Sequence, residues 1–199
     1  MSESTGNNLP LRGSRLLQWF GRLVMKLLGW RFDGHLPNIP KQVVIVAPHT
    51  SNWDFIIGLM VVFALDIRAH WIGKHTIFVP PLGRMMEGLG GIPVNRALPN
   101  DLVKATTKRF AAEEKFMLGL APEGTRGRVE KWKQGYYRIA VGAGVPIVCA
   151  ALDYRMRTIR FGTTLTPSGD LNRDFAKIRD FYAGVTAKFP EKFHLPDAA

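Results

Sequence analysis

Apolar, β-branched runs alternate with helix-like segments through the middle of the chain, and this alternation constrains the fold most strongly. The run Val43–Ala47 is continuously apolar, as in a strand buried on both faces of a sheet. Further strands are predicted at Ala69–Ile72, Ile92–Val94, Lys115–Leu120 and Pro146–Leu152. Helices are predicted between them, at Trp53–Leu65, Gly83–Leu89, Leu102–Glu114 and Gly135–Val141. The sequence therefore predicts an α/β fold, with a mostly parallel central sheet flanked by helices.

The C-terminal part continues this pattern with an expected edge strand at Arg157–Gly162 and a closing helix at Asp174–Phe189. A length of 199 residues suits one domain with a small appendage, and it allows a core to be buried without disulfides. Cys149 is the single cysteine, so no internal disulfide can form, which fits a reducing compartment. In such folds the loops at the carboxyl ends of the parallel strands are the usual site of chemistry.

The formal net charge of the chain is +11, and the basic residues are concentrated in two regions. Residues 11–31 contain five basic residues and no acidic one, whereas residues 96–138 contain ten basic and five acidic residues. Nucleic acid, an anionic membrane surface and a polyanionic small ligand are all candidate partners for such a chain. Composition alone does not choose among them.

Residues 11–31 are predicted to form an amphipathic helix after a flexible N-terminus, residues 1–10. Apolar side chains recur at helical spacing from Leu16 to Leu28, with basic side chains on the other side. This pattern suits a helix in a membrane interface, and it equally suits a helix that covers the core of its own domain. No uncharged run approaches the roughly 20 apolar residues that cross a bilayer. A membrane contact is therefore expected to be peripheral or monotopic, on the cytoplasmic face of the cell membrane.

His49 and Asp54 lie in the segment that follows the predicted strand Val43–Ala47. Ser51 is the expected N-cap of the next helix, which places Asp54 at the third helical position. A carboxylate there can accept the imidazole N–H of His49 and fix its tautomer, leaving the other ring nitrogen as a base. The alternative is purely structural, because Ser51-x-x-Asp54 is also a capping box.

Two later loops combine glycine with arginine, a combination that can bind an anion. The first contains Gly90 and Gly91 and ends at Arg96, whose guanidinium could form a fork onto a phosphate. The second follows the strand Lys115–Leu120 and reads Pro122-Glu123-Gly124-Thr125-Arg126. Its structural alternative is an ordinary turn whose glutamate and arginine pair in solvent.

Taken together, these motifs resemble the ordered set of the glycerolipid acyltransferases, most closely the 1-acylglycerol-3-phosphate (lysophosphatidic acid) acyltransferases. The set is His49-x-x-x-x-Asp54, the Gly-x-Ile-x-Val-x-Arg run that ends at Arg96, the Pro-Glu-Gly-Thr-Arg turn, and Val145-Pro146-Ile147-Val148. The resemblance extends from about Val43 to Ala150 and implies an acyltransferase domain over residues 32–199. The family commonly has a basic or amphipathic N-terminal helical element on the membrane, which favours the interfacial interpretation of residues 11–31.

The resemblance implies that His49 is the general base and Asp54 its orienting partner. The acceptor hydroxyl would attack the thioester of acyl-CoA or acyl-carrier protein directly, with no metal and no further cofactor. Substrate-binding residues would be Lys74, Arg96, Glu123, Gly124, Thr125 and Arg126, with the two arginines holding a phosphate if the acceptor has one. Pro48 and Gly127 stand where the family often has Asn and Ser, so another acceptor, such as a lyso-ornithine lipid, stays open.

Two other functions fit parts of the sequence. A basic nucleic-acid-binding module would explain the net charge, but the N-terminal basic residues alternate with an apolar stripe instead of a base-stacking platform. The expected partners are therefore an anionic membrane surface, the acyl donor and a lysolipid acceptor, and not nucleic acid. A thioesterase would use the same scaffold with water as the acceptor. His70 and His75 have no third ligand nearby in the sequence, so no zinc site is predicted.

Overall fold

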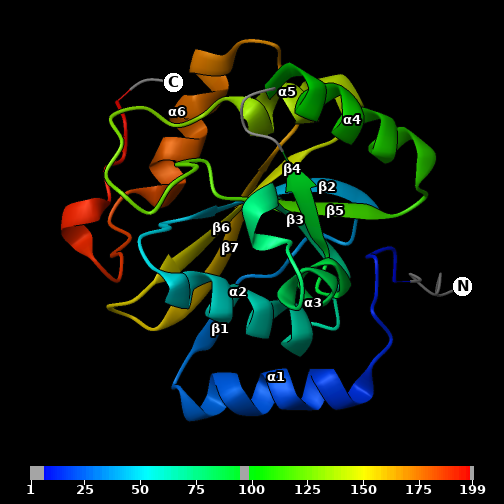
Figure 1. Cartoon of the computed structure of the whole chain (residues 1–199). Coiled ribbons are helices and arrows are strands. Elements are labelled where there is room, and N and C mark those ends of the chain that lie inside the picture. The colour runs from blue at the N-terminus through cyan, green and yellow to red at the C-terminus, as the bar shows by residue number, and fades with distance from the viewer. Residues whose placement is uncertain (1–6, 95–98, 198–199) are drawn as a thin grey trace, which may run out of the picture.

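The computed structural model describes residues 7–94 and 99–197, which form one seven-stranded sheet with helices on both faces (Figure 1). The strand order is β1-β7-β6-β2-β5-β3-β4. The strands are β1 (Arg31–Asp33), β2 (Lys41–Ala47), β3 (Ala69–Lys74), β4 (Gly91–Val94), β5 (Phe116–Leu120), β6 (Ile147–Asp153) and β7 (Thr158–Leu165). The helices are α1 (Arg15–Leu27), α2 (Asn52–Ala64), α3 (Leu82–Gly88), α4 (Pro99–Ala112), α5 (Gly135–Ala143) and α6 (Leu171–Tyr182), with 3-10 turns η1 (His75–Ile77) and η2 (Pro190–Lys192).

The strand β2 lies at the centre of the sheet and pairs in parallel with β5 and β6. Val43 and Ile45 pack into the core on one face of the sheet, and Val44 packs into a second cluster. The prediction of a strand buried on both faces is therefore confirmed. Its carboxyl end leads directly into the segment that contains His49.

The expected edge strand is wrong in its position. The strand β7 pairs antiparallel with β6 on one side and parallel with β1 on the other, so it lies inside the sheet. Residues Arg31–Asp33 of β1 form the edge, and all three are exposed. Because a strand with exposed side chains needs no apolar run, the sequence pattern gave no sign of β1.

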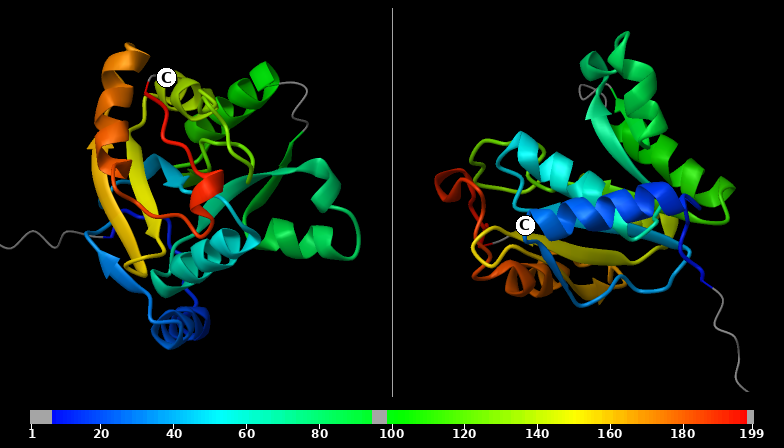
Figure 2. Two further views of the ribbon diagram at one scale, coloured as in Figure 1. Left: turned by 90° about the vertical axis from the view of Figure 1, so that its left-hand side faces the viewer. Right: turned by 90° about the horizontal axis from the view of Figure 1, so that it is seen from below.

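Helices cover the two faces of the sheet unequally (Figures 1 and 2). On one side, α4, α5 and α6 pack against the sheet, and Phe110, Tyr136 and Phe175 enter the larger core cluster. On the other side α2 covers the sheet, and α1 packs outside α2. This layered arrangement is the α/β fold that the alternating pattern predicts.

The helix α1 contacts α2 through a narrow strip. Gly21 is buried there, and an added Cβ would lie 2.6 Å from the backbone nitrogen of Ala64, so the two helices meet at the glycine. Much of the apolar stripe stays outside this contact: Leu16 is 73% exposed and Leu27 is 76% exposed. Within residues 7–94 and 99–197, no helix combines the length and apolarity needed to cross a bilayer. The boundary expected between residues 31 and 32 falls inside β1.

The closing helix is shorter than the predicted Asp174–Phe189. The helix α6 begins after Asp170, whose side chain accepts the N–H of Arg173, and it ends at Tyr182. Ala183 then has a ψ of 129°, which takes the chain out of the helix, and Gly184 follows with a φ of +76°. The segment that follows returns to the carboxyl edge of the sheet, where the N–H of Phe189 donates to Oγ1 of Thr50.

Candidate active site

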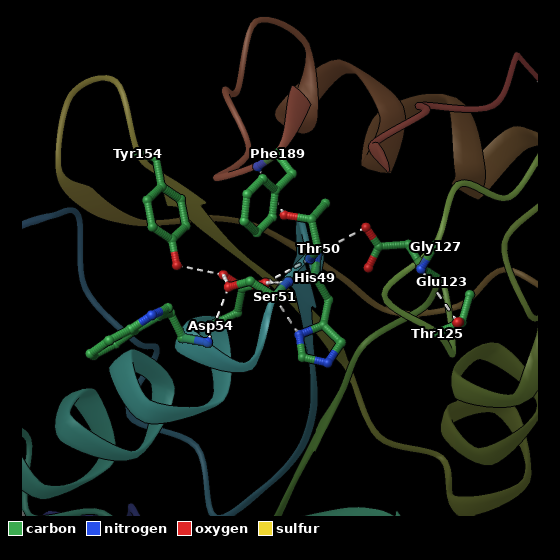
Figure 3. Close-up of polar contacts among 10 residues, drawn as sticks. His49, Thr50, Ser51, Asp54, Glu123, Thr125, Gly127, Tyr154 and Phe189 are labelled. Carbon is green, nitrogen blue, oxygen red and sulfur yellow. Dashed lines mark hydrogen bonds and ion pairs between the residues drawn. The ribbon is translucent and has the colours of Figure 1, made fainter. Parts of the chain in front are cut away.

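Segments that are distant in the sequence meet at the carboxyl edge of the central strands. His49 follows β2, the 121–127 turn follows β5, and Tyr154 follows β6 (Figures 1 and 3). Because these three strands are parallel neighbours, their carboxyl ends open onto the same edge of the sheet. Parallel pairing thus gathers the candidate residues in one place.

Asp54 lies in the first turn of the helix α2 and is buried. Its Oδ2 accepts the backbone N–H groups of Thr50 and Ser51 at 2.6 and 2.7 Å, and Ser51 forms the reciprocal half of a capping box. Its Oδ1 accepts hydrogen bonds from Oγ of Ser51 at 3.1 Å and from the hydroxyl of Tyr154 at 2.5 Å. The predicted capping box is therefore present. The carboxylate is held by four donors, which fixes its orientation.

His49 lies beside this carboxylate, with 3.6 Å between its Nδ1 and Oδ2 of Asp54. The side chain of His49 is 25% exposed and that of Asp54 is 3% exposed, so the pair runs from the wall of a cavity into the interior. This distance is longer than a hydrogen bond, so the contact between the imidazole and the carboxylate is an electrostatic one. The pair is thus arranged so that Asp54 can hold an Nδ1–H while Nε2 serves as a base.

Glu123 is buried behind His49 and does not line the cavity. Its Oε1 accepts the backbone N–H of His49 at 2.9 Å, and its Oε2 is buried without a hydrogen-bond partner among the described residues. The pKa of Glu123 is raised to about 7, mainly because the carboxyl group is buried. The backbone N–H of His49 opposes this shift, and the nearby Asp54 adds to it. We expected Glu123 to contact the acceptor, whereas in the structure it contacts the loop that carries the base.

The turn after β5 places Thr125 and Arg126 on the cavity wall, and both are exposed. Gly124 has a φ of +65°, and an added Cβ would lie 2.7 Å from Cδ of Lys133. The glycine therefore allows the turn and also the close passage of the lysine side chain. Lys133 is held in turn by its backbone N–H, which donates to the carbonyl of Pro122 at 2.8 Å.

A cavity of about 830 Å³ lies in front of His49. Its lining includes the cationic and polar side chains of Thr125, Arg126, Lys133 and Arg138. It also includes the apolar side chains of Ile72, Val94, Leu102, Val103 and Ile139. The helix α5 begins at this wall, and its first turn contains no acidic residue. A cavity with such a lining offers contacts both to an anionic group and to a hydrocarbon chain.

The structure brings together His49, Asp54, Glu123, Gly124, Thr125 and Arg126. Lys74 ends β3 and is exposed outside the described cavity lining, and Arg96 lies outside the described residues. Sequence reasoning missed Lys133, Arg138 and Tyr154. The two basic residues lie shortly after the glycine-rich turn, and Tyr154 lies two residues after the predicted strand Pro146–Leu152. This closeness in the sequence was the signal that could have found them.

Comparisons with known proteins find acyltransferases. The Acyltransferase family model matches residues 33–153. The chloroplastic 1-acyl-sn-glycerol-3-phosphate acyltransferase BAT2 of Brassica napus is 31% identical over 119 residues, which are 57% of this chain and 33% of that protein. PlsC, the 1-acyl-sn-glycerophosphate (LPA) acyltransferase from Thermotoga maritima, shares the fold with a TM-score of 0.55 at 18% identity, covering 87% of this chain and 81% of that one.

The chain therefore spans about a third of the length of the curated relative it matches. The family match itself covers more than half of the chain, and it contains both members of the His49–Asp54 pair and the turn with Arg126. On this evidence, the chain belongs to the Acyltransferase family.

Proposed function

We propose that the protein transfers a fatty acyl group from acyl-CoA or acyl-carrier protein to the hydroxyl of a lysophospholipid such as 1-acylglycerol-3-phosphate. The observation that carries this proposal is the His49–Asp54 pair, which opens onto a cavity lined by both cationic and apolar side chains. The plant relative is a 1-acyl-sn-glycerol-3-phosphate acyltransferase, and this likeness supports the choice of acceptor.

In the proposed reaction His49 acts as the general base. Its Nε2 takes the proton from the acceptor hydroxyl as the oxygen attacks the thioester carbonyl carbon. The C–S bond then breaks, and the leaving sulfur takes the proton back from His49, so the products are an ester and a free thiol. Asp54 holds the Nδ1–H and stabilises the imidazolium that forms, and a positioned base of this kind contributes roughly 10²–10⁴ in rate. The reaction as written requires no metal and no other cofactor.

The cationic side chains of the cavity lining form the proposed phosphate-binding site. Arg126, Lys133 and Arg138 lie along one cavity at the start of α5, where the first-turn N–H groups also favour negative charge. Arg96 and Lys74 stay candidates for substrate binding from the motif resemblance alone. The apolar side chains of the cavity lining then contact the acyl chains of the acceptor and the donor.

Labelled acyl donor offered to a panel of acceptors tests this proposal directly. The purified protein is incubated with radiolabelled acyl-CoA and either lysophosphatidate, a neutral lysolipid, a lyso-ornithine lipid or no acceptor, and the products are separated by headgroup. We expect label in phosphatidate. If label appears only in the product of the lyso-ornithine lipid, that lipid is the acceptor and lysophosphatidate is not. Release of labelled free fatty acid without any acceptor would indicate the thioesterase alternative.

A membrane surface is the proposed location of the substrates, with a peripheral contact on the cytoplasmic face of the cell membrane. Two groups of exposed apolar side chains support this contact: Leu16, Trp19, Phe20, Leu23 and Leu27 on α1, and Ile77, Val79, Leu82 and Met85 between β3 and β4. Basic side chains of α1 lie beside the first group, and anionic headgroups attract such charge. Flotation with anionic vesicles is expected, whereas salt-sensitive binding to duplex DNA without flotation would favour the nucleic-acid alternative.

A further inference from the structure

We propose that Tyr154 is a positioning residue of the active site, which holds the carboxylate of Asp54 in the orientation that supports His49. The inference rests on the proposed function. Tyr154 lies one residue beyond the segment matched by the family model, residues 33–153. Its hydroxyl nevertheless donates to Oδ1 of Asp54 at 2.5 Å, across a sequence separation of 100 residues.

The two carboxylate oxygens of Asp54 have different partners. Oδ2 lies 3.6 Å from Nδ1 of His49 and accepts two backbone N–H groups, whereas Oδ1 is held by Tyr154 and Ser51. Figure 3 shows Asp54 between the ring of Tyr154 and the ring of His49. The hydroxyl thus binds the oxygen other than the one nearest to Nδ1 of His49, and it resists rotation of the carboxylate away from the histidine.

The hydroxyl of Tyr154 is suited to act as a permanent donor. Burial raises its pKa, and the neighbouring Asp54 carboxylate raises it further, so the proton stays on the oxygen throughout the physiological range. The carboxylate is 3% exposed, and a buried charge requires donors of this kind.

Tyr154 is itself held by parts of the chain outside the catalytic loops. Its backbone N–H donates to the carbonyl of Thr186 at 2.9 Å, and its ring meets the ring of Trp30 edge-on at a centroid distance of 5.1 Å. Nζ of Lys188 lies 5.8 Å from the centroid of the tyrosine ring. The segment after α6 therefore stabilises the position of a residue that touches the proposed base pair.

The substitution Tyr154→Phe removes one oxygen and leaves the ring in place. We expect kcat for acyl transfer to fall roughly tenfold, the usual cost of a hydrogen bond to a charged group, while KM for the acceptor stays within about twofold. The matched control is Tyr137→Phe, because the hydroxyl of Tyr137 donates to Asp174 at 2.8 Å away from the cavity lining. This control is expected to lower the melting temperature and to leave kcat unchanged.

Two further measurements separate the possible outcomes. His49→Ala serves as the reference. If this variant is inactive while Tyr154→Phe has native kcat, the inference about Tyr154 is wrong and the proposed function stands. If His49→Ala is fully active, His49 is not the base, and the proposed function itself is contradicted. In the native protein, a slowly exchanging hydroxyl proton of Tyr154 is expected by NMR, and this measurement does not depend on the folding of any variant. A rapidly exchanging proton would overturn the inference.

Discussion

At the scale of single residues, Asp54 shows how one side chain can cap a helix and also lie beside the proposed general base. It closes the capping box that starts α2, and the same carboxylate lies beside His49. The sequence allowed both interpretations. The structure is compatible with both, because the carboxylate has two oxygens and accepts four hydrogen bonds. Glu123 was predictable as a member of a motif, but its burial behind His49 was not, because turn residues are usually exposed.

Glu123 leads to a prediction for stability as a function of pH. Its pKa is raised to about 7 in the folded protein, so between about pH 4.5 and 7 the folded state binds more protons than the unfolded state. The free energy of unfolding therefore falls as pH rises through this window, by at most about 3 kcal/mol from this group. Glu123→Gln keeps a carbonyl acceptor for the N–H of His49 and should remove this pH dependence. Urea unfolding of both proteins at pH 5 and pH 8 measures the free energy of unfolding. An equal change between the two pH values in both proteins would contradict the raised pKa of Glu123.

At the scale of elements, the contact between α1 and α2 depends on the absence of a side chain at one position. A Cβ on Gly21 would meet backbone atoms of α2 at 2.6 and 2.8 Å, whereas a Cβ on Gly58 in the middle of α2 would meet nothing within 4 Å. These two glycines share a helical setting and differ in their surroundings, which makes them a matched pair.

Alanine at the two positions should change stability in opposite directions. Gly21→Ala forces α1 away from α2 and is expected to lower the free energy of unfolding by about 1–3 kcal/mol. Gly58→Ala is expected to raise it by about 0.5–1 kcal/mol, because alanine is the better helix former. Urea denaturation measures both values. A Gly21→Ala variant as stable as the native protein would show that α1 does not pack closely on α2.

The elements also show why the sequence predicted some strands and not others. Val43–Ala47 was visible because both of its faces are buried, whereas Arg31–Asp33 has three exposed residues and forms a strand only through pairing with β7. The position of β7 inside the sheet could not be predicted without β1. The predicted closing helix was too long. The observed helix ends at Tyr182, although apolar residues continue at helical spacing beyond it.

At the scale of the whole molecule, parallel strand order creates the site. The motifs that follow β2 and β5 were predictable as neighbours, because adjacent parallel strands share a carboxyl edge. The contact of Tyr154 with Asp54 depends on β6 lying on the other side of β2 and on the path of the C-terminal segment, and neither was available from local patterns. The fold was therefore more predictable than the full set of side chains around the pair.

The exposed stripe of α1 predicts how the molecule as a whole meets a membrane. The triple substitution Leu16→Glu, Trp19→Glu and Leu27→Glu places acids on highly exposed positions, so it should leave the fold intact and reduce binding to anionic vesicles by about tenfold or more. Val141→Glu is the matched control, because Val141 is an exposed apolar residue on α5. Vesicle flotation compares the three proteins, and undiminished flotation of the triple variant would exclude α1 as the membrane contact.

The most direct test of the central claim, that His49 is the base of an acyl transfer, is the rate of ester formation in the His49→Ala protein. The measurement uses labelled acyl-CoA and the acceptor that the panel identifies, with thermal melting to verify folding. Loss of a positioned general base predicts a fall in kcat of at least about 10²-fold in a protein that melts as the native one does. Near-native turnover by the folded variant would contradict the account.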